Sequence, residues 1–396
     1  MQSVENRNLH VLILPTWYPN GKDKLMGIYH KQFASALAAH GVTVNMLYID
    51  RQGMRLWPKY PFMKKQGVES EDGYTVYLRK MPDLTKISHA MQRRAYARYL
   101  VKLYRHYEKR HGKPDIIHAQ VTLPAGYAAC RLGERFGIPV VITEHASYFE
   151  RFFDGKDSIY GRYAAEHAAA FTCVSHYMCD LCRKRGFAAS VLPNIVDCSS
   201  FLRERKDKAD VRLHFVTVSA LRPGKRIDHA ILALRALREK QLLPPFTYTV
   251  VGDGSEEERF RRLAVECEMT DCVSFVGRKT KEEIAAILAE SDVLLMASDI
   301  ETFGIPAVEA LAAGVPVVST KCRGPEGFLT EACAELCDCG SPDALADAIL
   351  RMVTRLSSIQ PVVLRQTAAQ FDAPSVAQTA VALYRKVLSD RPTDRA

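Results

Sequence analysis

The strongest constraint on the fold is an alternation of short apolar runs with helical segments. Runs such as His10–Leu14 and Pro139–Thr143 have the length and composition of buried strands. Between such runs lie segments with helical periodicity, among them Gly27–His40, which is followed by a glycine suited to end a helix. Strands and helices that alternate in this way predict a parallel sheet with helices on both faces.

The alternation stops at a polar segment, Asp207–Asp210, and then begins again. A chain of 396 residues is also too long for one ordinary hydrophobic core. We therefore predict an α/β protein with two doubly wound, Rossmann-like domains, residues 1–204 and 205–370, and a cleft between them. The strands predicted in the second domain are His214–Ser219, Thr247–Val251, Val273–Phe275, Val293–Met296 and Val315–Ser319.

Charge is distributed unevenly along the chain. Residues 1–205 carry 30 Lys and Arg against 18 Asp and Glu, whereas residues 206–396 carry 24 against 27. A basic first half indicates an anionic partner, which is a membrane surface, a phosphorylated acceptor or nucleic acid. Because no nucleic-acid recognition motif is present, nucleic acid is not expected.

The sequence also indicates in which cellular compartment the protein works and whether it binds a metal. The first residues lack the basic and apolar regions of a signal peptide, and no window approaches the roughly 20 apolar residues of a membrane span. The eleven scattered cysteines are typical of reduced thiols, and Cys179 and Cys182 lack the partners of a zinc site. We expect a cytoplasmic protein without a metal or other cofactor, and no Asp-x-Asp motif is placed as a metal clamp.

One stretch, Ser298–Thr320, contains two glutamates that are eight positions apart, Glu301 and Glu309. On a helix this spacing is a little over two turns, so both carboxylates can reach one end of a cleft. Gly304 lets backbone amides approach an anion at a helix N-terminus. This pattern predicts a sugar-nucleotide pocket, with amides for phosphate and carboxylates for sugar and ribose hydroxyls. The alternative is an amphipathic helix with two solvated acids.

Two basic segments of the first half have less specific patterns. Residues 92–111 form a predicted helix with an aromatic and leucine face and seven Lys or Arg on the rest. Such a helix binds an anionic membrane, or it packs on the core and exposes its basic face to solvent; both interpretations are open. Arg51–Lys65 is a basic, aromatic loop that docks a lipid or glycan, or is a loop without a partner.

Several motifs together resemble the retaining nucleotide-sugar glycosyltransferases of glycosyltransferase family 4, which have the GT-B architecture. The most specific of them is the segment with Glu301 and Glu309. The resemblance covers nearly the whole chain, and the other motifs that carry it, in order, are Leu14–Pro19, Met26–Tyr29, Ala36–Val44, Asp115–His118, Ile142–His145, Cys173–Ser175, Leu192–Asp197, Ser219–Asp228, Val251–Gly254 and Phe275–Arg278.

The resemblance implies roles for three catalytic residues. Glu301 contacts the hydroxyls of the transferred sugar, His145 lines the sugar site, and Lys225 places a positive charge on the diphosphate. His118 and Glu144 lie in the same motifs with weaker cases, and Glu144 is equally well explained as a solvated loop residue.

The resemblance also implies a set of donor-binding residues. Glu309 accepts the ribose hydroxyls, and loop amides hold the phosphates. Where the family commonly has Gly-Arg, this chain has Ser219-Ala220, and we expect Arg222 to supply the missing arginine. The donor-binding residues are Gly27, Arg222, Lys225, Gly252, Arg278, Thr302, Phe303, Gly304, Ile305 and Glu309.

The implied activity is metal-independent, retaining transfer of a sugar from a nucleotide-diphosphate donor, expected to be a UDP-sugar. The acceptor is a hydroxyl of a glycan or lipid-linked molecule in the assembly of a surface polysaccharide or glycolipid. As in the family, the first domain holds the acceptor, and the last helix, residues 371–396, joins that domain. We expect the enzyme in the cytoplasm, peripherally on the inner face of the cell membrane. Alternatives are a nucleotide-sugar epimerase of the same architecture and a non-catalytic protein that binds sugar nucleotides.

Overall fold

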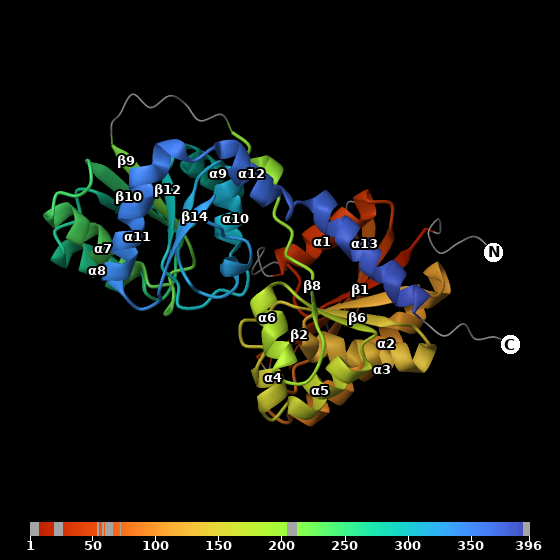
Figure 1. Cartoon of the computed structure of the whole chain (residues 1–396). Helices are drawn as coiled ribbons and strands as arrows, with labels where there is room; N and C mark the ends of the chain where they lie inside the picture. The colour runs from red at the N-terminus through yellow and green to blue at the C-terminus, as the bar shows by residue number, and fades with distance from the viewer. Residues whose placement is uncertain are drawn as a thin grey trace. The chain divides into compact units, whose positions relative to one another are not determined.

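The computed structural model describes residues 8–19, 27–53, 55–57, 59, 66–71, 73–203 and 212–390. The predicted linker 207–210 and most of the aromatic loop 51–65 beyond Gly53 lie outside the described residues. The chain forms two compact units (Figure 1), of which the first comprises Met1–Ile195 with Ala373–Ala396 and the second Val196–Asp372.

The first unit is built on one sheet of eight strands in the order β3-β4-β2-β1-β5-β6-β7-β8. All neighbouring strands are parallel except β3 and β4 at one edge, which are antiparallel. The central strands are apolar and almost fully buried, because helices cover both faces of the sheet. The strands are β1 (His10–Pro15), β2 (Thr43–Gln52), β3 (Gln66–Glu71), β4 (Tyr74–Pro82), β5 (Ile116–Gln120), β6 (Val140–Glu144), β7 (Ala170–Cys173) and β8 (Ser190–Val191).

Helices cover the two faces of this sheet in separate groups (Figure 1). The first helix packs with the C-terminal helix on one face, and α2 packs with α3 on the other. The hydroxyl of Tyr384 in the C-terminal helix lies 2.6 Å from Nδ1 of His118, which anchors the chain end to β5. The helices are α1 (Ile28–Ala39), α2 (His89–His111), α3 (Tyr127–Phe136), α4 (Arg151–Asp154), α5 (Ser158–His167), α6 (His176–Arg183) and α13 (Ala373–Ser389).

The second unit contains a wholly parallel sheet of six strands in the order β11-β10-β9-β12-β13-β14. This is the order of a doubly wound sheet, in which the direction of winding reverses between β9 and β12. The loops that follow β9 and β12 therefore run in opposite directions, and the space between such loops is where ligands of doubly wound sheets bind. The strands are β9 (Leu213–Val218), β10 (Phe246–Val251), β11 (Val273–Phe275), β12 (Val293–Met296), β13 (Val317–Thr320) and β14 (Ala334–Cys337).

Two groups of helices sandwich this second sheet (Figure 1). On one face α7, α8 and α11 share a core with the strands, and on the other α10 packs against α12. Two doubly wound domains were predicted from the alternation, and that fold class is confirmed. The helices are α7 (Ile227–Glu239), α8 (Glu257–Glu266), α9 (Lys281–Glu290), α10 (Ile305–Ala312), α11 (Pro342–Arg355) and α12 (Pro361–Ala369).

The units divide at 195/196 and 372/373, whereas the sequence predicted 204/205 and 370/371. The first difference has a local cause in the short helix Cys198–Phe201, which packs against α9 and α10. Just before it, the Asp197 carboxylate accepts a hydrogen bond of 2.8 Å from Nζ of Lys281 at the start of α9. These contacts attach the segment to the second unit before the polar linker begins.

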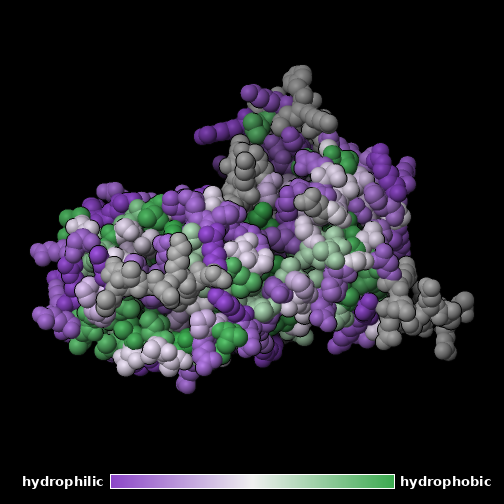
Figure 2. Space-filling view, turned by 90° about the horizontal axis from the view of Figure 1, so that it is seen from above, coloured by the Kyte–Doolittle hydropathy of each residue, from purple (hydrophilic) through white to green (hydrophobic). Residues whose placement is uncertain are grey.

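Hydrophilic and hydrophobic residues are interspersed over the face of the protein drawn in Figure 2. Across the described ranges, every helix is too short or too polar to cross a membrane.

Candidate active site

Lys225 and Glu301 meet at the reversal point of the second sheet. Lys225 follows β9 and Glu301 follows β12, and Nζ of Lys225 lies 2.5 Å from Oε1 of Glu301. The hydroxyl of Ser298 donates a second hydrogen bond, 2.9 Å long, to the same carboxylate oxygen. These three side chains line one small pocket with the ends of the two strands. The structure therefore brings together, within one unit, two side chains that the sequence assigned to the same donor site.

Backbone hydrogen bonds fix the loops that carry these side chains. The amide of Asp299 donates to the carbonyl of Gly224 at 2.8 Å, which joins the loop after β12 to the turn before Lys225. On its other side, the Glu301 backbone bonds to Cys322 and Gly324 in the loop after β13, at 2.8 and 2.9 Å. Three consecutive loops of the sheet edge are thus connected through Glu301.

Helix α10 begins just after Gly304. The spacing of the two glutamates was reckoned along one helix, but Gly304 has φ 96° and the helix starts only at Ile305. This left-handed conformation favours glycine, and an added Cβ would also lie 2.6 Å from Cγ of Pro325. Glu301 therefore lies in the preceding loop, and only Glu309 lies on the helix.

The amides at the start of α10 are available for an anion. Among the described residues, the amides of Thr302 to Ile305 donate no backbone hydrogen bond within the protein. Unsatisfied amides at a helix N-terminus favour phosphate. The ring of Phe303 is buried against Phe328 and Phe371, so its side chain belongs to the core.

Glu309 lies in different surroundings from Glu301. Burial of its carboxylate raises the pKa of Glu309 to about 7, and the positive charge of Lys281 opposes that shift. A carboxylate with this pKa exchanges its proton near neutral pH. The structure thus gives the two predicted acids different partners.

The other predicted donor-binding residues of this unit lie farther along the same sheet edge. Arg222 is exposed in the turn closed by the amide of Lys225 and the carbonyl of Arg222, 3.2 Å apart. Gly252 packs so closely on the loop after β9 that an added Cβ would lie 1.8 Å from the carbonyl oxygen of Ser219. Only a glycine at position 252 therefore lets these two loops pack together. Arg278 is exposed and pairs with Asp253 at 3.3 Å.

The first unit places His145 at the end of β6 in a polar pocket. Nδ1 of His145 lies 2.9 Å from Oδ1 of Asn194, and Nε2 lies 2.7 Å from Oε1 of Gln120. Exclusion of water lowers the pKa of His145 to about 4, although Asn194 favours the charged form. The ring is therefore neutral at pH 7. Tyr29 lines the same pocket.

Two neighbours of His145 are buried. Glu144 is fully buried and accepts hydrogen bonds from the amides of Thr122, His145 and Ala146. The interpretation of Glu144 as a solvated loop residue is wrong, because its carboxylate ties two loops together. His118 is also fully buried, beneath the pocket.

Gly27 lies at the start of α1 with φ 72°. An added Cβ there would lie 2.7 Å from the carbonyl oxygen of Trp17, so the two loops approach closely. The adjoining motif residue Met26 lies outside the described residues.

Sequence reasoning missed several polar residues of both units. Gln120 and Asn194 orient His145, and Ser298 bonds Glu301. Their positions at the ends of predicted strands were the available signal. Across the described parts of the chain, no group of three or more His, Cys, Asp or Glu residues is arranged to hold a metal ion.

Two family descriptions match adjoining parts of the chain. "Glycosyltransferase Family 4" matches residues 26–200, and "Glycosyl transferases group 1" matches residues 199–359. The boundary between the matches falls close to the boundary between the two units. The pocket with Lys225 and Glu301 lies in the second match.

Individual relatives agree with these matches. D-inositol 3-phosphate glycosyltransferase of Pseudarthrobacter chlorophenolicus is 26% identical over 331 residues, 76% of this chain and 74% of that protein. A GDP-mannose-dependent alpha-(1-6)-phosphatidylinositol monomannoside mannosyltransferase of Mycobacterium tuberculosis is 32% identical over 42% of this chain and 48% of that protein.

The fold agrees with a solved structure, HepE of Anabaena in complex with UDP. The TM-score is 0.71 at 16% identity, and the alignment covers 96% of this chain and 100% of that one. With both halves matched by glycosyltransferase families and the two-sheet fold shared, the chain belongs to glycosyltransferase family 4 and is a glycosyltransferase with the GT-B fold.

Proposed function

We propose that this enzyme is a metal-independent, retaining transferase that moves a sugar from a nucleoside-diphosphate donor to a hydroxyl. The observation that carries the proposal is the Lys225–Glu301 pair at the reversal point of the second sheet. Ligands of doubly wound sheets bind at that point, beyond the carboxyl ends of the strands. The second unit then holds the donor.

Stabilisation of the leaving group is the main requirement of this chemistry. The diphosphate departs as an anion, and Lys225 with the amides of Thr302 to Ile305 would stabilise the charge that develops on it. The donor would replace Glu301 as the partner of Lys225, and Glu301 would then accept hydroxyls of the sugar. In a retaining transfer the departing phosphate can take the proton of the acceptor hydroxyl, so no strong base is needed.

Glu309 and His145 have secondary roles in the proposal. Glu309 would accept ribose hydroxyls, most strongly when it is ionised, above its pKa of about 7. His145 is neutral at pH 7 and would exchange hydrogen bonds with a sugar hydroxyl in place of Gln120 or Asn194.

The nucleotide base is proposed to be uracil. HepE is described in complex with UDP, whereas the mycobacterial relative is described as GDP-mannose-dependent. GDP-mannose is therefore the specific alternative. The same relative is named for a phosphatidylinositol acceptor, which supports a lipid-linked or glycan acceptor in surface polysaccharide or glycolipid assembly. The relatives named above are transferases, so the epimerase interpretation has no support from them.

A donor panel tests the proposal. Purified protein is incubated with UDP-glucose, UDP-galactose, UDP-N-acetylglucosamine, ADP-glucose and GDP-mannose, with and without lipid extract, and release of nucleoside diphosphate is measured. We expect release from one donor, and a loss of about 100-fold or more in Lys225→Ala and Glu301→Gln. Lys240→Ala, at the far end of α7, is the matched control and should retain full activity. A donor that binds without any release would favour the non-catalytic alternative.

Peripheral membrane binding through α2 is a separate part of the proposal. The apolar face of α2 is buried within the first unit, so it is not available to insert into lipid. Of its seven Lys and Arg side chains, Arg93 is buried and pairs with Asp157 at 2.9 Å. The other six remain exposed and form a stripe along the helix, which fits electrostatic adsorption to anionic lipid. The exposed basic residues are Arg94, Arg98, Lys102, Arg105, Lys109 and Arg110.

Co-sedimentation with lipid vesicles tests whether the exposed basic residues of α2 bind anionic lipid. The wild type should bind phosphatidylcholine vesicles that contain 30% phosphatidylserine, and binding should weaken at high salt. Replacing Arg98, Lys102 and Arg105 by Gln should weaken binding severalfold. Equal substitutions at the exposed residues Lys240, Arg262 and Arg385 serve as the control. Binding that changes neither with salt nor with the α2 substitutions would contradict adsorption through α2.

A further inference from the structure

Arg226, the residue after Lys225, has an unusual backbone. It precedes α7 with φ 50° and ψ 43°, in the left-handed region that residues with a Cβ seldom adopt. Such strain persists where the surrounding contacts hold the residue in place. The contacts of the side chain therefore show what this conformation provides.

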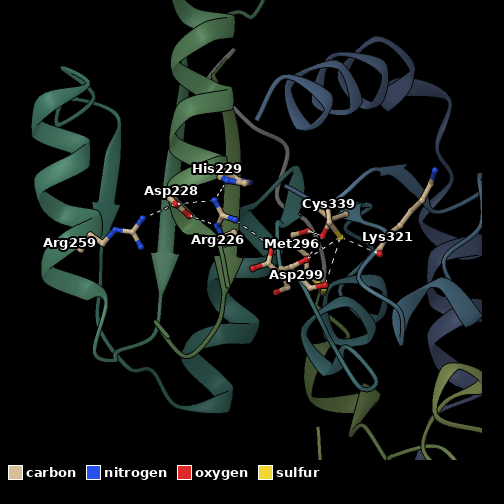
Figure 3. A network of polar contacts seen from close by, with 10 residues as sticks. Arg226, Asp228, His229, Arg259, Met296, Asp299, Lys321 and Cys339 are labelled. Atoms are coloured by element: carbon tan, nitrogen blue, oxygen red, sulfur yellow. Dashed lines mark hydrogen bonds and ion pairs between the residues drawn. The ribbon is translucent and has the colours of Figure 1, made fainter. Parts of the chain in front are cut away.

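The guanidinium group of Arg226 lies between two acids (Figure 3). Its Nε and Nη2 donate to the carboxylate of Asp228 at 3.2 and 3.4 Å, and Nη1 lies 3.6 Å from Oδ1 of Asp299. Nη2 also contacts the ring of His229. With all three guanidinium nitrogens engaged, Arg226 is poorly suited to bind a phosphate itself.

Asp228 is a firm anchor for this arrangement. Its side chain is buried, and Arg259 on α8 donates a further hydrogen bond of 3.0 Å to it. Asp299 lies in the loop that leads from β12 to Glu301. The Arg226–Asp299 ion pair therefore connects a buried anchor on α7 to that loop.

The same two loops are also joined by the hydrogen bond from the amide of Asp299 to the carbonyl of Gly224, 2.8 Å long. Lys225 follows Gly224, and Glu301 lies two residues after Asp299. A backbone bond on one side and an ion pair on the other thus fix the separation of the two donor-binding side chains.

We propose that Arg226 is a positioning residue that, through Asp228 and Asp299, holds Lys225 and Glu301 at the separation that a bound diphosphate requires. This inference rests on the proposed function of the Lys225–Glu301 pocket. Because Arg226 acts on geometry, its loss should weaken diphosphate binding without unfolding the protein. Glycine adopts the left-handed conformation without strain, so Arg226→Gly removes the guanidinium and keeps the backbone.

Isothermal titration of the whole protein with UDP, GDP and ADP tests the inference, with Tm measured for each variant. For the nucleotide that binds the wild type, we expect Arg226→Gly to raise Kd about tenfold, with Tm unchanged or higher. Arg226→Lys should recover most of the affinity. Asp299→Asn should resemble Arg226→Gly, and the double variant should be no weaker than either single one, since both act through one ion pair.

Gln241→Gly is the matched control, because Gln241 also has positive φ, 53°, but lies past the other end of α7. Its Kd should equal that of the wild type. If the wild type binds a nucleotide and Arg226→Gly binds it with the same Kd, the positioning role is overturned while the proposed function is not. A lower Tm in Arg226→Gly, with binding lost in proportion and no recovery by lysine, would assign Arg226 to folding instead. A wild type that binds none of the three nucleotides would overturn the proposed function, and the inference with it.

Discussion

The two glutamates that we propose to bind the donor differ in how they hold their charge. Glu301 has a cation at 2.5 Å, whereas the carboxylate of the half-buried Glu309 is shielded from water, with Lys281 as the opposing charge. Burial disfavours the ionised form, so the folded chain keeps the proton of Glu309 at pH values where the unfolded chain has lost it. The folded protein therefore loses stability as pH rises from about 4.5, the ordinary value, to about 7.

Replacing Glu309 by Gln removes this titration. We expect the variant to gain stability relative to the wild type as pH rises from 5 to 8, by an amount on the order of 2 kcal/mol. Thermal unfolding at several pH values measures the difference. A wild-type and variant difference that is constant with pH would show that the carboxylate is not buried as described.

Some site residues were predictable from sequence, and others were not. Lys225 and Glu301 follow predicted strands within motifs, so their meeting at one sheet edge could be anticipated. Arg226 was not singled out, because its partner Asp299 is 73 positions away and only the fold brings them together. The solvated alternative for Glu144 stayed open, because sequence does not show that three loop amides converge on it.

Among the elements, the start of α10 is tightly constrained. Its glycine has both a left-handed backbone and no room for a side chain, since Cγ of Pro325 would lie 2.6 Å from a Cβ on Gly304. Gly304→Ala should therefore cost about 2–3 kcal/mol of stability. It should also weaken nucleotide binding, because the amides of Thr302 to Ile305 would shift. Calorimetry and titration of one variant measure both effects.

A substitution at Gly340 separates the cost of the left-handed backbone from the cost of the contact with Pro325. This glycine has a similar φ, 82°, but an added Cβ there would meet nothing within 4 Å. Gly340→Ala should cost only about 1 kcal/mol and leave nucleotide binding unchanged. Equal losses in the two variants would mean that backbone strain alone, rather than the contact with Pro325, limits the start of α10.

The elements that sequence predicted are those with strong apolar periodicity. The central parallel strands were located to within a few residues, because their apolar runs are buried on both faces. Strands β3 and β4 were missed. Every residue of β3, Gln66–Glu71, is exposed or half-buried, so no apolar run marks this strand. Helix α2 begins at His89 rather than Gln92, because the side chain of Ser88 caps it.

In the whole molecule, the chain returns to its first unit after completing the second. The returning helix packs apolar side chains into the core of that unit, and a buried hydrogen bond of 2.6 Å between Tyr384 and His118 joins residues 266 positions apart. Tyr384→Phe leaves a buried imidazole nitrogen without that partner and should cost about 1–2 kcal/mol. Thermal unfolding measures the loss. Tyr160→Phe, which keeps the ring packed against Tyr127, should change little.

The two-domain organisation was predictable from sequence, since the alternation of strands and helices restarts after a polar segment. The exact division was not, because residues 196–203 were predicted to belong to the first domain but bond to α9 through Asp197 and Lys281. The uneven distribution of charge between the two halves could likewise be predicted from the sequence. Which basic side chains remain exposed depends on how α2 packs.

The most direct test of the donor pocket is a crystal structure of the protein with a bound nucleoside diphosphate, UDP first and GDP if UDP does not bind. We expect the diphosphate beyond the ends of β9 and β12, with phosphate oxygens about 3 Å from Nζ of Lys225 and from amides of Thr302 to Ile305. A diphosphate bound elsewhere, with Lys225 still paired to Glu301, would contradict this expectation.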